Sequence, residues 1–362
     1  MSVNIKEFQN QLESEIRKSS KVFIIGHNQP DFDSIGSAIG LYTLVAHLGK
    51  KAYIVVNDDE LTLEPGVKKI MDENRKKIRF IKNAEAEVLL DKRSILIATD
   101  VNKYDRISLG EDLDRFKSIL VIDHHSEGPT TIKTDKKFIT EEISSASEIV
   151  TRLLCNLKVR YGADVANCLL AGINLDTHRF KEKTTSKTHD IAEKLIDKGA
   201  NLDYVNNLFL EEFETFCRIS NLIINGTVIK KYSDSLSPIQ VSFTLNRNMP
   251  KEIYKKEDYA KAADRMMKFN GIDAAFTLGY IDTETIHISA RGNKKVNVGK
   301  IMETINGGGN SQSAGGRIVS EDIIGVEEKL MNQILVGLSS EEPVIENPKV
   351  IKGKQIHRGK KS

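Results

Sequence analysis

The sequence has no tryptophan and only three cysteines among its 362 residues. The cysteines, Cys155, Cys168 and Cys217, are odd in number and form no Cys-x-x-Cys pair. This pattern argues against a disulfide framework and against a cysteine zinc site. Cys168 lies in an apolar helical stretch, so we expect it to be a buried packing thiol. The reducing environment of the cytoplasm fits this usage best.

Long apolar runs are missing as well. No stretch approaches the roughly 20 apolar residues that a membrane-spanning helix needs, and charged residues begin at Lys6 without an apolar leader. The 53 basic and 51 acidic residues give a net charge of +2, which provides no general surface of one sign for coating nucleic acid. We therefore expect a soluble cytoplasmic protein with no membrane partner.

Short apolar runs rich in β-branched residues recur along the first half of the chain. They lie at 22–25, 52–56, 95–98 and 119–122, separated by helix-sized segments. Runs of this length and composition are typical of buried parallel strands. The fold class predicted here is α/β, with an N-terminal parallel sheet that carries helices on both faces.

The second half has a different character. Residues 239–245 and 285–291 alternate between polar and apolar, which predicts half-exposed strands, and a helix over 259–269 lies between them. We expect a smaller α+β domain here. The predicted boundaries are 1–190 for the first domain, 191–225 for a helical linker, 226–338 for the second domain and 339–362 for a disordered basic tail.

Acidic and imidazole side chains follow the predicted strands of the first domain. Since the carboxyl ends of neighbouring parallel strands open onto one crevice, these side chains should meet there. A further carboxylate ends a helix that begins near Ala163. The complete set of candidate ligands is His27, Asp31, Asp33, Asp100, Asp123, His124, His125 and Asp176.

This mixture of donors predicts a metal site. Carboxylate oxygens with imidazole nitrogens suit Mn²⁺, Mg²⁺, Fe²⁺ or Zn²⁺. A single Asp after a strand is more often a turn former or a helix N-cap, but two adjacent histidines at a strand end are not explained in that way. The donors exceed the needs of one ion, so a second ion and a bridging carboxylate are expected. Two such ions are the usual apparatus for hydrolysing phosphodiesters.

Four motifs in order resemble those of the DHH phosphoesterase superfamily. They are the run from His27 to Gly36, then Asp100, the triplet Asp123-His124-His125, and Asp176. The second domain resembles the DHH-associated domain through Ile288-Ser-Ala-Arg291, Val296 to Met302, and Gly307 to Gly309. The resemblance covers about residues 15–335, so it implies a DHH catalytic domain followed by a DHH-associated domain.

Within the superfamily the chain looks most similar to the catalytic module of the GdpP-type cyclic-di-AMP phosphodiesterases. The segments that carry this similarity include Gly26 to Asn28, Asp33 to Gly40 and Ile143 to Val150. The resemblance implies a hydrolase that converts cyclic di-AMP to the linear dinucleotide pApA, with AMP as a further product left open. The membrane helices and sensory domains of full-length GdpP proteins are absent from this sequence.

The resemblance also implies roles for individual residues. It places one Mn²⁺ on His27, Asp31 and Asp100, and a second on Asp33, Asp100, His124 and Asp176. Asp100 would bridge the two ions, Asp123 would orient the neighbouring imidazole, and His125 would lie near the scissile phosphate. Asp100, Asp123 and His125 are therefore the expected catalytic residues.

The implied substrate-binding residues lie in the second domain. They are Ser289, Arg291, Gly307, Gly308, Gly309 and Asn310. The guanidinium of Arg291 offers a planar fork to a phosphate, and consecutive glycines allow backbone N–H groups to approach an anion. For the glycines alone, a flexible turn is the better interpretation, and with Arg291 on a polar strand face before them the two interpretations are about equal. The family usually has His at the position of Asn310, and Asn carries no charge and does not stack as imidazole does.

Two alternatives stay open at this point. The same chemistry suits a nano-RNase that degrades short oligoribonucleotides, or a phosphatase acting on 3′-phosphoadenosine 5′-phosphate. A non-catalytic nucleotide-binding protein is the remote alternative, because no expected metal ligand is missing. The expected partner is thus a nucleotide: cyclic di-AMP, pApA or short RNA. A homodimer and a nucleic-acid contact of the basic tail are left open.

Overall fold

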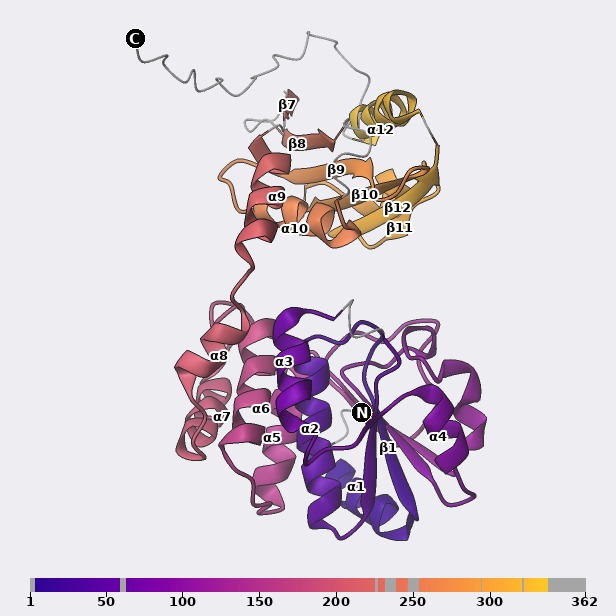
Figure 1. The fold of residues 1–362 in the computed structure, drawn as a ribbon, viewed down its shortest axis with the longest axis vertical. Helices are drawn as coiled ribbons and strands as arrows, with labels where there is room; N and C mark the ends of the chain where they lie inside the picture. Colours follow the sequence, from indigo (N-terminus) through magenta and orange to yellow (C-terminus); the bar gives the residue numbers. More distant parts are fainter. Residues whose placement is uncertain are drawn as a thin grey trace. The chain divides into compact units, whose positions relative to one another are not determined.

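The computed structural model describes residues 4–58, 63–224, 227–231, 239–246, 254–293, 295–320 and 322–337. It divides into two compact units, Met1–Leu210 and Glu211–Ser362. Each unit has its own sheet (Figure 1).

The first unit is built on a six-stranded sheet whose paired strands all run parallel. In spatial order its strands are β3 (Phe80–Ile81), β2 (Lys51–Val55), β1 (Lys21–Ile25), β4 (Ile95–Thr99), β5 (Ser118–Asp123) and β6 (Lys137–Ile139). The chain starts in the middle of the sheet and winds outward in both directions. The order therefore reverses between β1 and β4, which is where open α/β sheets bind their ligands.

Alternation along the strands directs apolar side chains to both faces of this sheet. Val22 and Ile24 of β1 belong to one core, whereas Phe23 and Ile25 belong to the other. The first core is covered by α1 (Ile5–Lys18), α2 (Phe32–His47), α3 (Pro65–Asn74), α5 (Ala146–Asn156), α6 (Ala163–Asp176), α7 (Ser186–Asp197) and α8 (Leu202–Leu208). The second is covered by α4 (Asn83–Leu89) and by the segment 101–116, which contains the 3₁₀ turns Tyr104–Arg106 and Gly110–Arg115. The predicted α/β fold with helices on both faces is confirmed.

Small residues allow helices α2 and α6 to approach closely. A Cβ atom at Gly36 would lie 3.0 Å from the backbone carbonyl carbon of Cys168 on α6, and closer still to its oxygen. Gly40, one turn further along α2, faces Leu169 and Val150 in the same way. Cys168 itself is buried, as expected for a packing thiol. This close packing fixes the position of the first turn of α2, which carries two of the predicted metal ligands.

The second unit is the predicted smaller α+β domain. Its mixed sheet has the spatial order β11 (Gly308–Gly309), β12 (Ser313–Val319), β10 (Thr285–Gly292), β9 (Ala274–Tyr280), β8 (Ile239–Asn246) and β7 (Thr227–Lys231). Helices α11 (Val298–Glu303) and α12 (Ile323–Gly337) pack on one face. Helices α9 (Phe213–Ile224) and α10 (Lys256–Met266) pack on the other.

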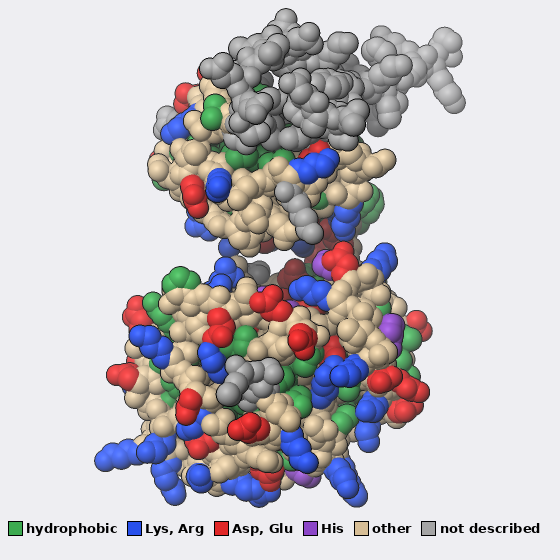
Figure 2. Space-filling view, turned by 180° about the vertical axis from the view of Figure 1, so that it is seen from behind, with side chains coloured by type: hydrophobic (Ala, Val, Ile, Leu, Met, Phe, Trp, Pro, Cys, Tyr) green, Lys and Arg blue, Asp and Glu red, His purple; other side chains and the backbone are tan. Residues whose placement is uncertain are grey.

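The segment predicted as a linker, 191–225, is shared between the units. The part of α7 within this segment and all of α8 lie in the first unit, and α9 lies in the second. The predicted tail, 339–362, is outside the described residues. Among the described helices, none has the length and apolar character required to cross a membrane. Figure 2 shows acidic and basic side chains interspersed over the visible face of the first unit, in agreement with the near-neutral net charge.

Replacement of Gly36 by alanine tests the helix contact. The new methyl group would press against the backbone of α6, which cannot turn aside as a side chain can. We expect a loss of roughly 1–3 kcal/mol in the free energy of unfolding from overpacking, despite the better helix propensity of alanine. Urea denaturation of the first unit measures this. Gly128→Ala is the control, because its methyl would meet only Lys103 Cε at 3.7 Å. Equal stability of the two variants would contradict the packing described here.

Candidate metal centre

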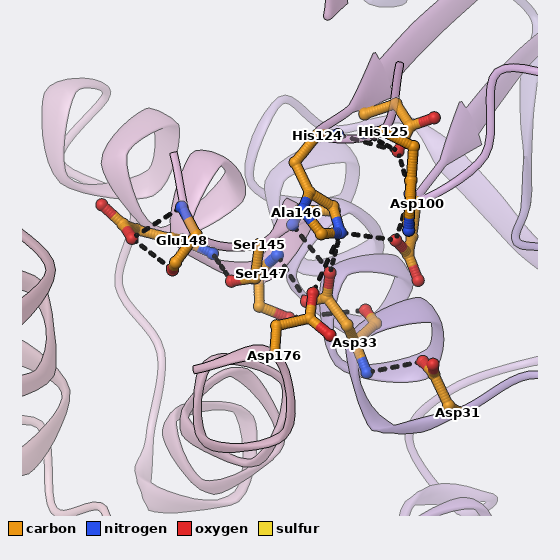
Figure 3. A network of polar contacts seen from close by, with 12 residues as sticks. Asp31, Asp33, Asp100, His124, His125, Ser145, Ala146, Ser147, Glu148 and Asp176 are labelled. Atoms are coloured by element: carbon orange, nitrogen blue, oxygen red, sulfur yellow. Dashed lines mark hydrogen bonds and ion pairs between the residues drawn. The ribbon is translucent and has the colours of Figure 1, made fainter. Parts of the chain in front are cut away.

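All eight predicted ligands of the first unit meet at the carboxyl edge of its sheet. Figure 3 shows six of them, namely Asp31, Asp33, Asp100, His124, His125 and Asp176. Within this edge, three overlapping groups of donor atoms lie within 4.8 Å of one another. The groups are His27, Asp31 and Asp100; Asp33, Asp100, His124 and Asp176; and Asp100, Asp123, His124 and His125. Asp100 is the member common to all three. The first two groups are the two ligand sets expected from the sequence.

The first group is held by contacts that leave one donor atom of each residue facing inward. Asp31 is the N-cap of α2, and its Oδ1 accepts from the backbone N–H groups of Asp33 and Ser34 at 2.9 and 3.0 Å. His27 Nδ1 lies 3.0 Å from the carbonyl oxygen of Asn28, so it is the nitrogen suited to carry the proton. The remaining atoms converge: His27 Nε2 lies 3.6 Å from Asp31 Oδ2 and 3.4 Å from Asp100 Oδ2.

The second group surrounds the imidazole of His124. Its Nε2 lies 2.9 Å from Asp176 Oδ2, 3.4 Å from Asp100 Oδ1 and 3.9 Å from Asp33 Oδ2. Asp176 is the last residue of α6, as predicted. The side chains of His124 and Asp100 are almost completely buried. Each oxygen of Asp100 therefore faces a different histidine.

Helix α5 holds Asp33 in place. Both carboxylate oxygens of Asp33 accept hydrogen bonds from the first turn of this helix, Oδ2 from Ala146 N at 2.7 Å and Oδ1 from Ser147 N at 2.8 Å. The positive end of the helix dipole stabilises a carboxylate at that position. Ser145 caps the same helix, as the capping pattern in the sequence predicts. The capping pattern did not indicate, however, that the free backbone N–H groups of this first turn would bind a side chain more than a hundred residues away in the sequence.

Asp100 has an unusual backbone conformation. Its φ of +57° lies in the left-handed region, which costs a residue with a Cβ roughly 1–2 kcal/mol. The conformation is held by a hydrogen bond from Asp100 N to the carbonyl oxygen of Ile122 on the neighbouring strand β5, at 2.9 Å. Strain of this kind is concentrated at functional sites. Here it accompanies the turn that brings the carboxylate between the two histidines.

Asp123 makes different contacts from those expected. We predicted that Asp123 orients the imidazole of the adjacent His124. Instead, its Oδ1 contacts the ring of His125 through Nδ1 at 2.9 Å. The same oxygen accepts from the backbone N–H groups of His124 and His125 at 2.8 and 3.2 Å. Asp123 is fully buried, whereas the side chain of His125 is 55% exposed. Asp123 thus shapes the turn and orients the second histidine.

The donor set fits a divalent cation. Three buried atoms of the site lack a hydrogen bond of good geometry: Asp100 Oδ1, His124 Nε2 and Asp176 Oδ2, the last two of which form a 2.9 Å ion pair only when the imidazole is protonated. Buried polar atoms are nearly always satisfied, so each exception needs an explanation. These three belong to one group and point at one another, as a shared ion requires. Oxygen donors with imidazole and no thiolate match Mn²⁺, Mg²⁺ or Fe²⁺ better than a closed structural zinc site.

The pKa values show how strongly the site demands positive charge. Burial alone lowers the pKa of His27, but Asp100 and Asp31 outweigh it and raise the pKa to about 11. Burial also opposes the charged form of His124, whose pKa is nevertheless raised to about 11 by Asp100 and Asp176. Burial, with the charges of Asp100 and Asp176, raises the pKa of Asp33 well above its ordinary value. Without a metal ion, protonated histidines hold the carboxylates together.

Arg291 and Ser289 lie on β10 in the second unit, on the face covered by α10. Ser289 is buried, and its Oγ lies 3.0 Å from His287 Nε2. The guanidinium of Arg291 is held by Asp264 of α10, with Nε 2.6 Å from Oδ1 and Nη2 3.4 Å from Oδ2. A phosphate that uses Arg291 must therefore share it with Asp264 or displace that carboxylate.

The glycines of this unit form a short strand. Gly308 and Gly309 pair with Gly315 and Ala314 of β12, so they are not merely a flexible turn. A Cβ atom at Gly308 would meet nothing within 4 Å, and this glycine faces open space. Asn310 Oδ1 accepts from the backbone N–H groups of Gln312 and Ser313 at 2.9 and 2.8 Å. The amide oxygen of Asn310 is thereby committed to its own turn.

Comparison with protein families agrees with both units. The model described as "DHH family, N-terminal domain" matches residues 21–173, and the "DHHA1 domain" model matches residues 238–335. The first match contains seven of the eight candidate ligands, and Asp176 lies three residues beyond its end. The second match contains all the predicted substrate-binding residues.

Two relatives are similar along most of the chain. The cyclic-di-AMP phosphodiesterase PdeA of Listeria monocytogenes is 29% identical over 335 residues, which cover 89% of this chain and 48% of that protein. The cyclic-di-AMP phosphodiesterase GdpP of Bacillus subtilis is 29% identical over 339 residues, covering 92% of this chain and 50% of that protein. The chain spans about half the length of these relatives.

A solved structure shares the fold. An exopolyphosphatase-related protein from Bacteroides fragilis superimposes with a TM-score of 0.70 and 23% sequence identity. The superposition covers 91% of this chain and 97% of the other.

Metal binding should release protons. At pH 7.5, below the raised pKa values of His27 and His124, both imidazoles of the metal-free protein hold a proton that a bound cation must displace. We expect Mn²⁺ affinity to increase as the pH rises toward these pKa values. Calorimetry in buffers of different ionisation enthalpy counts the protons. His27→Gln should lower the count by about one, and substitution of the exposed His47 should not change it. Binding without proton release would contradict the pKa values given above.

Proposed function

We propose that this chain, which carries a DHH domain over residues 21–173 and a DHHA1 domain over residues 238–335, is a metal-dependent phosphodiesterase that hydrolyses cyclic di-AMP to pApA. The observation that supports the chemistry best is the carboxylate of Asp100, whose two oxygens each lie 3.4 Å from a different histidine. A bridging carboxylate of this kind is what a site for two adjacent ions needs. The family domains support a hydrolase acting on phosphoric ester bonds.

The cofactors we propose are two divalent ions, both Mn²⁺. His27, Asp31 and Asp100 would hold one, and Asp33, Asp100, His124 and Asp176 the other. When bound, such ions polarise phosphoryl oxygens and lower the pKa of water. The protein supplies the preorganisation: the amides of α2 fix Asp31, and the amides of α5 fix Asp33.

His125 is the residue we propose to contact the scissile phosphate. Its Nδ1 is held by Asp123, so its Nε2 is directed away from that carboxylate. The ring is half exposed beside a buried cluster, where a substrate can reach it. When both ring nitrogens carry a proton, Nε2 can donate a hydrogen bond, or that proton, to a phosphate oxygen as the ester bond breaks. Asp123 then favours the tautomer that carries its proton on Nδ1.

The choice of substrate is supported by similarity across both units. PdeA and GdpP, whose names specify cyclic di-AMP, match 89% and 92% of this chain. The DHHA1 unit would bind the nucleotide through Arg291, Ser289 and the backbone around Gly308. Asn310 departs from the family pattern, and its amide oxygen already caps a turn. The contribution of this position to nucleotide binding should therefore be smaller than that of an imidazole.

A side-by-side assay tests the substrate. The purified protein with Mn²⁺ is given cyclic di-AMP, pApA, a five-nucleotide RNA and 3′-phosphoadenosine 5′-phosphate at equal concentrations, and products are separated by chromatography. We expect the largest kcat/KM for cyclic di-AMP, with pApA as the first product. A larger kcat/KM for the RNA would instead support the nano-RNase alternative. A larger kcat/KM for the bisphosphate would support the phosphatase alternative. Such a result would still agree with the proposed metal site.

Removal of the shared carboxylate tests the site. Asp100→Asn keeps the shape of the side chain but loses the charge between the two histidines, and the loss of several kcal/mol of transition-state stabilisation is expected. This corresponds to a decrease in kcat of at least about 10²-fold. Asp72→Asn on the exposed surface of α3 is the matched control and should retain full activity. An active Asp100→Asn variant would show that the metal site is misassigned.

A further inference from the structure

Asn102 is a buried residue that none of the motifs includes. It lies two residues after Asp100, and its side chain is 0% exposed. Its Nδ2 lies 2.7 Å from Asp123 Oδ2, 3.0 Å from the carbonyl oxygen of His125 and 3.4 Å from that of Ser126. One amide group thus ties the turn after β4 to the turn after β5.

We propose that Asn102 is a positioning residue that sets the orientation of His125 through Asp123. The inference rests on the proposed function, because it concerns the imidazole that would contact the phosphate. Asp123 Oδ1 receives the ring and backbone N–H groups of His125, and its Oδ2 receives Asn102. Asn102 therefore fixes the rotation of the carboxylate that in turn fixes the ring. It also holds the carbonyl oxygen of His125, so the imidazole is fixed from both sides.

The chemistry of the pocket selects an amide at position 102. All three neighbours of Nδ2 are acceptors, so the group facing them must be the NH₂ and not the oxygen. A carboxylate of the same shape would bring two negative oxygens together where a hydrogen bond now exists. An apolar side chain would leave Asp123 Oδ2 buried without its donor, which costs about 1–3 kcal/mol or more for a charged group.

The backbone of Asn102 anchors the same region. Its carbonyl oxygen accepts from Ile132 N at 2.7 Å, within the loop that follows the two histidines. The backbone from which the side chain extends is therefore fixed independently of the contact with Asp123. By contrast, among the polar contacts described for the His125 ring, the only one besides Asp123 is Asp100 Oδ1 at 3.6 Å, beyond hydrogen-bond distance. Apart from Asp123, which Asn102 helps to hold, the ring of His125 contacts that of His124, with centroids 4.1 Å apart.

Histidine-labelled NMR spectra and steady-state kinetics test the proposal together. We compare the wild type with Asn102→Ala and Asn102→Asp, and assign the Nδ1–H resonance of His125 by its disappearance in His125→Gln. The expected result is loss or broadening of that resonance in both variants. We also expect kcat to fall by about 10–100-fold, the range typical of residues that hydrogen-bond to the residues of a site. The KM and the Mn²⁺ affinity should change by less than about threefold.

The matched control is Asn74→Ala. Asn74 is also a buried asparagine of the first unit, and its Nδ2 donates to the carbonyl oxygen of Ile70 at 2.8 Å, within α3. We expect a similar loss of thermal stability but an unchanged His125 resonance and kcat. If the Asn102 variants keep the resonance and a kcat within about twofold of the wild type, the proposal is wrong. If instead their kcat falls in parallel with Mn²⁺ affinity, Asn102 acts through the metal ligands, and the proposal is equally overturned.

A measurement on the wild type covers variants that fail to fold. The side-chain amide protons of Asn102 should exchange slowly with solvent, because all their acceptors are buried or internal. Rapid exchange would contradict the contacts on which the proposal stands. The NMR results do not depend on turnover, so a wild type that hydrolyses none of the nucleotides would refute the proposed function alone.

Discussion

The structure depends on the enforced proximity of four carboxylates, those of Asp31, Asp33, Asp100 and Asp176. They meet around two histidines in groups whose donor atoms lie within 4.8 Å of one another, and two of the carboxylates are almost completely buried. Like charges at this distance in a poorly solvated site repel strongly. The arrangement is stable only if positive charge lies among them. Protons on the histidines can supply it, and a divalent ion supplies it better.

The fold meets this constraint by using backbone groups as fixed counter-charges. Two helices start at the carboxyl edge of the sheet with their N-termini directed at carboxylates, α2 at Asp31 and α5 at Asp33. The close glycine contacts between α2 and α6 place Asp33 and Asp176 on the same side of the cluster. The left-handed turn at Asp100 completes it. The topology matters because the strand order reverses between β1 and β4, the strands that deliver His27 and Asp100.

Much of this could be predicted from the sequence, because strand ends and ligand types are local signals. The runs before His27, Asp100 and Asp123 predicted both the sheet and the edge at which these side chains meet. Long-range hydrogen bonds leave no such signal. Nothing in the spacing showed that the amides of Ala146 and Ser147 would bind Asp33, that Asn102 would bind Asp123, or that Asp264 would hold Arg291. Each of these pairs depends on how separate elements pack.

We propose that Asp100 joins two ion positions into one site. Anomalous diffraction at the manganese edge, from crystals grown with Mn²⁺, tests it most directly. We predict two peaks about 3.5–4 Å apart, one beside His27 and the other beside His124, each in contact with a different oxygen of Asp100. A single peak, or two peaks of which only one touches Asp100, would contradict the account.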